Sequence, residues 1–316
     1  MRDLLSLIDN ALLQGLGYGL AVLGIALAFR VLRYPDLTAD GSFVLGAVTF
    51  AAIVSAGGGW LSATAAAMAA GALAGLITAG LYKTFGVSRL LTGILTAMIA
   101  YSLAFRILGG QSNIGIRDAE TAFSLLAPWD QVIGATWGLH LGQVATSLIV
   151  AALILLAARV LLRSEVGLLM RSSGANPALV DQLNRSHGTY QIIGLAFANT
   201  LVALAGVMVT ARQGFADVNM GLGVIINLVA ALVIGEEIMR RVSGGRPMKL
   251  IYRLLTPFIG GIAYFLLYLL ILRASIRGWI PIQIQPTDLK MLSAIVVIAV
   301  VALRRARPGS EQILPL

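Results

Sequence analysis

The sequence predicts an all-α polytopic membrane protein, and composition and charge pattern both support this fold class. Of the 316 residues, 58% are hydrophobic and 12% are charged, and the mean hydropathy is +0.89. An ordinary soluble domain has about 45–50% apolar and about 25% charged residues. Long uncharged stretches recur along the chain, and about 20 mostly apolar residues let a helix cross the hydrocarbon core. A soluble enzyme, a disordered chain and a nucleic-acid-binding protein are therefore excluded, although the net charge is +9.

The uncharged stretches define about nine transmembrane helices, with a range of eight to ten, in one domain over residues 1–316. Gly57-Gly58-Gly59 before Trp60 divides the long uncharged stretch 41–82 into two spans, because glycines break helices and Trp anchors at the interface. The second and the last are the weakest of the expected spans. The expected spans are 11–33, 42–56, 60–82, 90–108, 140–162, 190–211, 219–238, 250–272 and 288–304.

The positions of Lys and Arg predict how the chain is oriented in a bacterial inner membrane. Cytoplasmic loops carry an excess of these residues. With the N-terminus outside and the helices alternating, 16 of the 23 Lys and Arg lie inside. The C-terminus is then cytoplasmic, 109–139 is an outer loop and 164–189 is a cytosolic loop. The first span lacks a clear cleavage site, so we expect it to stay in the protein.

Small residues recur at helical spacing within the expected spans. Gly15 and Gly19 are four residues apart, as are Gly71 and Gly75. Such faces let helices approach closely in lipid. They indicate helix packing within the chain or, alternatively, the seam of a dimer.

Residues for catalysis or metal binding are sparse. The chain has no Cys, so thiolate chemistry and Cys-ligated metals are excluded. The two histidines, His140 and His187, fall on opposite sides of the membrane in the expected topology. An intramembrane enzyme would need clustered His, Asp or Glu, so the pattern argues against one. We expect no metal and no cofactor bound by this chain.

The cytosolic loop 164–189 has the most specific pattern. Val166, Leu169 and Met170 recur at helical spacing, and Gly174 is expected to end that helix. Pro177 suits the first position of a second helix. Two short amphipathic helices would form a docking surface; the alternative is a solvated connector.

The loop carries the run Arg171-Ser172-Ser173-Gly174-Ala175-Asn176-Pro177, and a later span ends in Ala205-Gly206-Val207. This combination resembles the coupling-helix region of ATP-binding cassette (ABC) importer permeases of the branched-chain amino acid and ribose type. The run Tyr34 to Phe43 resembles the branch that is paired with lipoprotein-type binding proteins and linked to aromatic amino acid uptake, including tryptophan and tyrosine transporters.

The resemblance implies a homodimeric permease that forms the substrate pathway and works with two copies of a cytosolic ATP-binding subunit and an extracytoplasmic substrate-binding protein. The chain has no Gly-x-x-x-x-Gly-Lys-Ser/Thr phosphate loop, so ATP and Mg would bind to the partner subunit. The substrate would be an aromatic amino acid or a similar small polar solute. The residues expected to contact the ATPase are Leu169, Arg171, Gly174, Asn176, Pro177 and Asp181.

Four polar residues near or in the spans are candidates for the pathway or a gate. Asp36 and Asp40 would share one face if their segment were helical, because they are four residues apart. Either could instead cap a helix. Asn199 and Asn227 suit a pathway, and hydrogen bonding between helices explains them equally well.

Other charged residues have two interpretations each. Glu236 and Glu237 lie four residues before Arg240 and Arg241, which favours solvated ion pairs at a helix end or contact with the ATPase. Three outer residues would contact a binding protein or be ordinary solvated residues. These are Arg117, Arg212 and Asp217.

An aromatic substrate would need aromatic or Met walls, for which Phe105, Phe197 and Met208 are candidates. The alternative function is a stand-alone secondary transporter driven by an ion gradient. That class usually has inverted repeats, and nine spans do not divide into two halves.

Overall fold

The computed structural model describes residues 2–116, 119–126, 130, 139–244, 246, 248–278, 288, 291, 293–295 and 298–299. The long helices of this part are α1 (Arg2–Ala26), α2 (Ala39–Ser55), α3 (Trp60–Phe85), α4 (Arg89–Ile107), α6 (Leu141–Arg163), α9 (His187–Gln213), α10 (Val224–Val242) and α11 (Leu250–Ile276). The shorter elements are η1 (Leu27–Val31), β1 (Asn113–Gly115), η2 (Ser124–Leu126), α7 (Glu165–Ala175), α8 (Pro177–Gln182), β2 (Phe215–Asp217) and η3 (Val218–Gly221).

The predicted helical, polytopic fold is confirmed. Seven of the described helical segments are long and apolar enough to cross a membrane, and α2 is a shorter apolar helix. These eight coincide with the first eight expected spans. The ninth, 288–304, lies largely outside the described residues, so the count of nine stays a prediction. The predicted break also forms: α2 ends at Ser55, Gly57 has a φ of +84°, and α3 begins at Trp60.

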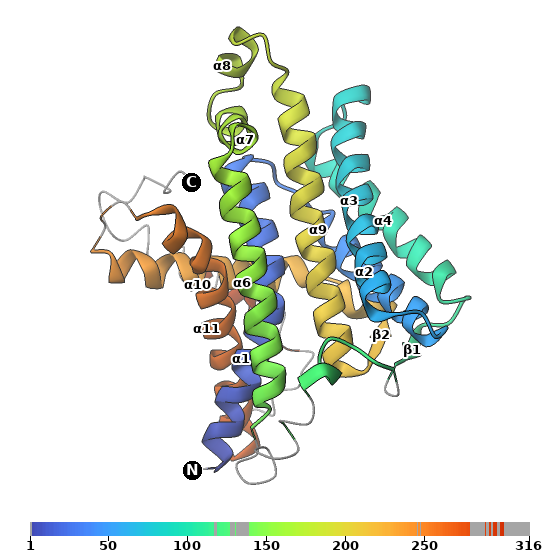
Figure 1. Cartoon of the computed structure of the whole chain (residues 1–316). Helices are drawn as coiled ribbons and strands as arrows, with labels where there is room; N and C mark the ends of the chain where they lie inside the picture. Colours follow the sequence, from blue (N-terminus) through green and yellow to red (C-terminus); the bar gives the residue numbers. More distant parts are fainter. Residues whose placement is uncertain are drawn as a thin grey trace.

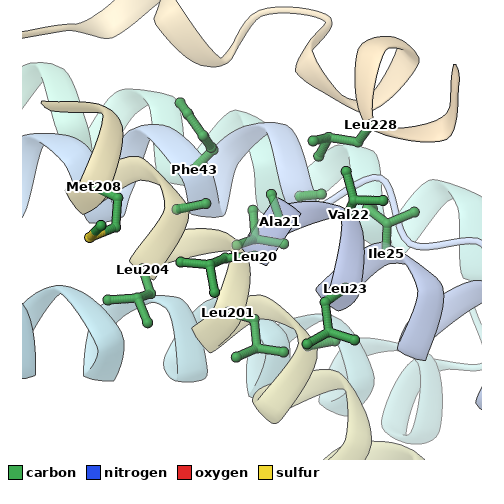
Figure 2. Close-up of a cluster of buried hydrophobic side chains, with 14 of the residues drawn as sticks. Leu20, Ala21, Val22, Leu23, Ile25, Phe43, Leu201, Leu204, Met208 and Leu228 are labelled. Carbon is green, nitrogen blue, oxygen red and sulfur yellow. The ribbon is translucent and has the colours of Figure 1, made fainter. Parts of the chain in front are cut away.

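The bundle has α1 and α9 at its centre. In their most apolar 18-residue windows, 78% and 72% of the residues are buried, against 22% in α6. Figure 2 shows Leu20, Val22 and Leu23 of α1 in one cluster with Phe43 of α2, Leu201 of α9 and Leu228 of α10, with Val22 next to Leu228. The outward side chains of α3, α4 and α6 are large and apolar, which is typical of a surface that faces lipid.

Both glycine pairs pack helices together within the chain. A Cβ on Gly15 or Gly19 of α1 would collide with Ile262 or Phe258 of α11, and a Cβ on Gly71 or Gly75 of α3 would collide with α9. Close backbone approach therefore requires glycine at these positions. Of the two interpretations, packing within the chain accounts for all four glycines.

The connection from α1 to α2 runs inside the bundle without helical structure. Residues 33–37 are not helical, yet Tyr34 and Asp36 are almost completely buried. The backbone amide of Tyr34 donates to the Ala28 carbonyl over 2.9 Å. Irregular backbone in a membrane protein needs such protein partners. The condition under which Asp36 and Asp40 would share one helix face is therefore not met.

The end of α10 is held by ion pairs that only partly follow the predicted spacing. Glu236 accepts two hydrogen bonds from Arg30 of η1, at 2.7 and 2.9 Å, instead of pairing with Arg240. Glu237 pairs with both Arg240 and Arg241. The predicted Glu237–Arg241 pair is confirmed. The predicted Glu236–Arg240 pair is wrong, because Glu236 forms its ion pair with Arg30 instead.

The two ends of the bundle differ in structure. At one end, called the α8 end, α7 follows α6 and α8 extends beyond the long helices (Figure 1). At the other, called the ribbon end, β1 and β2 pair antiparallel with Ile114 opposite Ala216. This ribbon was not predicted. It joins the chain after α4 to the chain after α9, and Ile116 adds a backbone bond to Gly214.

Candidate functional site

The predicted pair of short helices forms at the α8 end. Ser164 caps α7 by accepting a hydrogen bond from the Gly167 amide at 3.3 Å. Asn176 caps α8 in the same way, its side-chain oxygen accepting from Leu179 at 3.3 Å, and Pro177 occupies the first helical position. The bend between the helices therefore lies at Asn176, as the sequence indicates, and α8 points away from the bundle (Figure 1).

Gly174 has a different role from the expected one. The helix continues past it to Ala175, so the prediction that Gly174 ends the helix is wrong. A Cβ at this position would overlap the carbonyl oxygen of Val31. Glycine is required because α7 lies directly against η1. Leu169 and Met170 are also buried, so α7 is firmly attached to the bundle.

The same helix pair exposes three apolar side chains. Leu168, Leu179 and Leu183 are 55%, 45% and 59% exposed. Next to them in the sequence, the Nε–H of Arg171 is covered by the chain and has no hydrogen-bond acceptor among the described residues. Apolar side chains on a segment that extends from the bundle are typical of an interaction surface.

Asp181 connects α8 to the start of α9. Its carboxylate lies 2.8 Å from Nδ1 of His187 and accepts the His187 backbone amide at 3.2 Å. These hydrogen bonds hold the pKa of the Asp181 carboxyl below its usual range. At the ribbon end, His140 makes a similar contact with Asp9 at 2.8 Å. The two histidines are therefore at opposite ends of the bundle, as the sequence predicts.

A buried polar cluster joins three helices next to the α1–α2 connection. The side-chain amide of Asn199 in α9 donates to Asp36 at 2.7 Å, and the Ser42 hydroxyl donates to the Asn199 oxygen at 2.7 Å. The Thr38 amide donates to Asp36 at 2.9 Å, and the hydroxyls of Thr38 and Thr78 are 2.6 Å apart. Asp36 and Asn199 thus fix α9 against the start of α2.

Asp40 and Asn227 are also bonded between elements. The Asp40 carboxylate accepts from the amides of Gly223 and Ile225, at 2.9 and 2.7 Å, and so caps α10. Asn227 accepts from Ser293 at 2.7 Å. All four pathway candidates therefore make the contacts expected under the alternative interpretations: Asp40 caps a helix, and Asp36, Asn199 and Asn227 form hydrogen bonds between segments. None of the four lines any of the three cavities that contain Phe215, Arg212 and Lys83.

At the ribbon end the expected binding-protein contacts are differently placed. Asp217 caps η3 through the Asn219 amide at 2.6 Å. Arg212 turns inward and donates to Asn10 of α1 at 2.7 Å. Arg117 lies outside the described residues. A cavity of 840 Å³ opens at this end, between the 57–60 turn and the segment 113–120, and Phe215 of the ribbon lines it too.

A second cavity, of 220 Å³, combines a cation with aromatic walls. It lies between α1, α6, α9 and α11. Tyr18 stacks on Phe43 with 5.5 Å between ring centroids and lies 4.8 Å from Phe265. We call it the Arg212 cavity. The residues that give it this character are Tyr18, Phe123, Ser147, Met208, Arg212, Phe265 and Tyr268.

Sequence reasoning found only part of this cavity. Met208, one of the three residues predicted to form walls for an aromatic substrate, lines this cavity. Phe105 is exposed on the outside of α4, and Phe197 does not line the cavity. Tyr18 and Phe265 were missed because they are 247 positions apart in the chain. Only the contact between α1 and α11 brings them together.

Comparison with known proteins decides the family. Residues 7–302 match the family described as the permease component of the branched-chain amino acid transport system. The chain belongs to this family. A transport subunit, rather than an enzyme, follows from membership.

Two curated relatives match over almost the full length of the permease. A tyrosine transport system permease protein of Clostridioides difficile (strain R20291) is 28% identical over 298 residues, covering 93% of this chain and 90% of the relative. An uncharacterised protein of Rickettsia prowazekii (strain Madrid E) is 30% identical over 293 residues, covering 92% and 95%. No solved structure matches significantly.

Proposed function

We propose that the chain is the transmembrane subunit of an ABC importer, works as a homodimer, and couples to a separate ATP-binding subunit through α7 and α8. The observation that carries the proposal is the exposure of Leu168, Leu179 and Leu183 on the helix pair at the α8 end of the bundle. A partner subunit would cover these side chains, and family membership supports a partner of this kind.

The attachment of the helix pair suits a coupling role. Gly174 places α7 against η1, which continues α1, and Asp181 bonds α8 to the start of α9. Because α1 and α9 are largely buried, a displacement of α7 and α8 would reach the centre of the bundle. Rigid-body movement of packed helices is an established way of switching between conformations. ATP and Mg would act on the partner subunit.

The α8 end is proposed to be cytoplasmic and the ribbon end extracytoplasmic in a bacterial inner membrane. Arg30, Lys83, Arg89, Arg163 and Arg171 support this orientation, because Lys and Arg favour the cytoplasmic side. The extracytoplasmic binding protein would then contact the ribbon end. Asp217 lies there at the end of β2, partly exposed, two residues after Phe215, which lines the 840 Å³ cavity.

An aromatic amino acid is the proposed substrate. Arg212 supplies a cation for a carboxylate, and Tyr18 and Phe265 supply ring surfaces for an aromatic side chain. The name of the Clostridioides difficile relative, a tyrosine transport permease, supports the same class.

Single-cysteine cross-linking tests the coupling proposal, because the natural chain has no Cys. Leu179→Cys on α8 and Leu61→Cys on α3 at the ribbon end would be compared, since both side chains are exposed. Each variant would be co-expressed with the ATP-binding subunit encoded beside it and treated with a thiol-to-amine reagent. We expect an adduct with the ATP-binding subunit from Leu179→Cys alone, with a yield that changes on adding ATP.

Failure of the two chains to assemble would contradict the proposal and favour a stand-alone transporter driven by an ion gradient. Assembly with equal cross-linking from both positions would leave the ABC assignment standing and remove the coupling role of α8.

A further inference from the structure

A third cavity, at the α8 end, has the chemistry of an anion site and lies away from the coupling helices α7 and α8. It measures 350 Å³ and lies between the end of α3 and the start of α9. Small-molecule sites occupy about 300–1,000 Å³. We call it the Lys83 cavity. The residues that matter for the argument are Tyr34, Tyr82, Lys83, Ser186, Gly188 and Gln191.

Gln191 is the first observation that points to a ligand. Its residue is 3% exposed, it lines the cavity, and its side-chain amide has no hydrogen-bond partner among the described residues. Its polar atoms are not fully enclosed by protein, so they are accessible from the cavity that the residue lines. A ligand in the cavity would satisfy the amide that the protein leaves unbonded.

The start of α9 adds further donors. The helix has 27 residues and no side-chain cap at Ser186. The Asp181 carboxylate accepts the His187 amide, whereas in the described structure the Gly188 amide has no backbone acceptor. Free amides at a long helix N-terminus bind anions. The Lys83 side chain passes beside Gly188, because its Cδ and Cε would be 3.7 Å from a Cβ built on Gly188.

Lys83 is the cationic side chain that lines the cavity, and it makes no ion pair with a described residue. Arg89 lies behind the wall, with its guanidinium carbon 5.4 and 5.2 Å from the ring centres of Tyr34 and Tyr82. The nearby carboxylate of Asp181 is already bonded to His187. An ammonium, a helix N-terminus and an amide thus converge on one space.

We propose that the Lys83 cavity binds a phosphate group. A phosphate offers several acceptor oxygens, which matches the several donors better than a single carboxylate. Phe85 and Ile193 near the cavity are 71% and 38% exposed and offer an apolar surface to an acyl chain. The phosphate therefore belongs to the headgroup of an anionic phospholipid or, as the other source of the same chemistry, to a soluble phosphate.

The test uses the purified full chain and requires no partner subunit, so its outcome is separate from that of the transporter proposal. Lys83→Gln with Gln191→Leu would be compared with the natural chain and with Arg163→Gln. Arg163 is a matched control because it is also an exposed cation in the last turn of a helix at the α8 end. Binding would be measured by native mass spectrometry and by thermal unfolding with phosphatidylglycerol, phosphatidylcholine or inorganic phosphate.

Phosphatidylglycerol is expected to bind and stabilise the natural chain and Arg163→Gln, with phosphatidylcholine having little effect. In the double variant the apparent affinity should fall about tenfold or more, because charged hydrogen bonds are lost. An equal effect of inorganic phosphate on the natural chain would identify a soluble phosphate as the source. Lys83→Arg, which keeps the charge, should retain binding and provides a variant that folds if the double variant does not. Equal binding by the natural chain, Lys83→Gln and Arg163→Gln would overturn the proposal.

Discussion

The side-chain amide of Asn199 donates a 2.7 Å hydrogen bond to the carboxylate of Asp36 and so ties the central helix α9 to the buried connection before α2. The oxygen of the same amide accepts from Ser42. One side chain therefore bonds a buried acid and a buried hydroxyl, both on residues that are almost completely buried within the bundle.

Replacing Asn199 with Leu should destabilise the folded chain. Asp36 would lose a donor and the Ser42 hydroxyl its acceptor, at a cost of about 1–3 kcal/mol for each buried group left unbonded. Thermal unfolding in detergent measures the effect. Thr200→Val is the matched control, because its hydroxyl bonds only the Ala196 carbonyl of its own helix. Equal unfolding temperatures for the two variants would show that the cluster has no structural role.

Replacing Gly174 with Ala should displace α7 from η1, because the added methyl overlaps the Val31 carbonyl. We expect a lower unfolding temperature and weaker coupling between ATP hydrolysis and transport in the assembled complex. Gly80→Ala in α3 has open space around it and should be neutral or stabilising by up to about 1 kcal/mol. Unchanged coupling in Gly174→Ala would remove this glycine from the proposed mechanism.

A double-mutant cycle on Arg30 and Glu236 should give a measurable coupling energy. The pair is bidentate and its side chains are 22% and 19% exposed, so we expect about 1–3 kcal/mol. The Arg185–Glu165 pair, at 3.7 Å with both side chains exposed, should give at most about 0.5 kcal/mol. Equal coupling energies would mean that the first pair is as solvated as the second.

The contact between Asp181 and His187 should make the turn from α8 to α9 sensitive to acid. Because the pKa of Asp181 is lowered in the folded chain, the contact contributes stability above the ordinary Asp pKa of about 3.9. That contribution is lost as the pH falls through the lowered value. His187→Ala should open this turn at a higher pH than the natural chain does, as measured by hydrogen-exchange protection corrected for intrinsic rates. His140→Ala, at the ribbon end, should leave the turn unchanged; a matching shift in both variants would contradict the assignment.

Replacing Arg212 with Gln should reduce uptake of tyrosine by about tenfold, since a charged hydrogen bond to a carboxylate is worth about 1.5–3 kcal/mol. Arg106→Gln, an exposed cation at the same end, should change uptake less than twofold. Uptake would be measured in proteoliposomes that contain the complete complex, with thermal unfolding as the check on folding. Equal uptake by the two variants would place the substrate elsewhere.

The parts of the structure that depend on local sequence were predictable. Uncharged stretches located eight described spans, and Asn176-Pro177 located the bend between α7 and α8, because helix length, capping and proline geometry act within a few residues. Contacts between distant segments were not predictable in this way. Glu236 bonds to Arg30, 206 positions away, and Gly174 is required by the Val31 carbonyl.

The candidate sites also have some features that local sequence predicts and others that depend on contacts between distant segments. Residue types indicated that Asp36 and Asn199 need partners, but only the packed bundle shows that they bond to each other. The Lys83 cavity has no local motif, since α3 and α9 supply its donors from segments about 100 residues apart. Its one local signal is the absence of a side-chain cap at Ser186.

The most direct test of the central claim is the ATPase activity of this permease reconstituted with the ATP-binding subunit encoded beside it, with and without the neighbouring binding protein. The account predicts that the tyrosine-loaded binding protein stimulates hydrolysis, and that replacing Gly174 and Pro177 together abolishes the stimulation while the complex stays assembled. Failure of the permease to assemble with any ATP-binding subunit, together with tyrosine uptake driven by an ion gradient alone, would contradict the account.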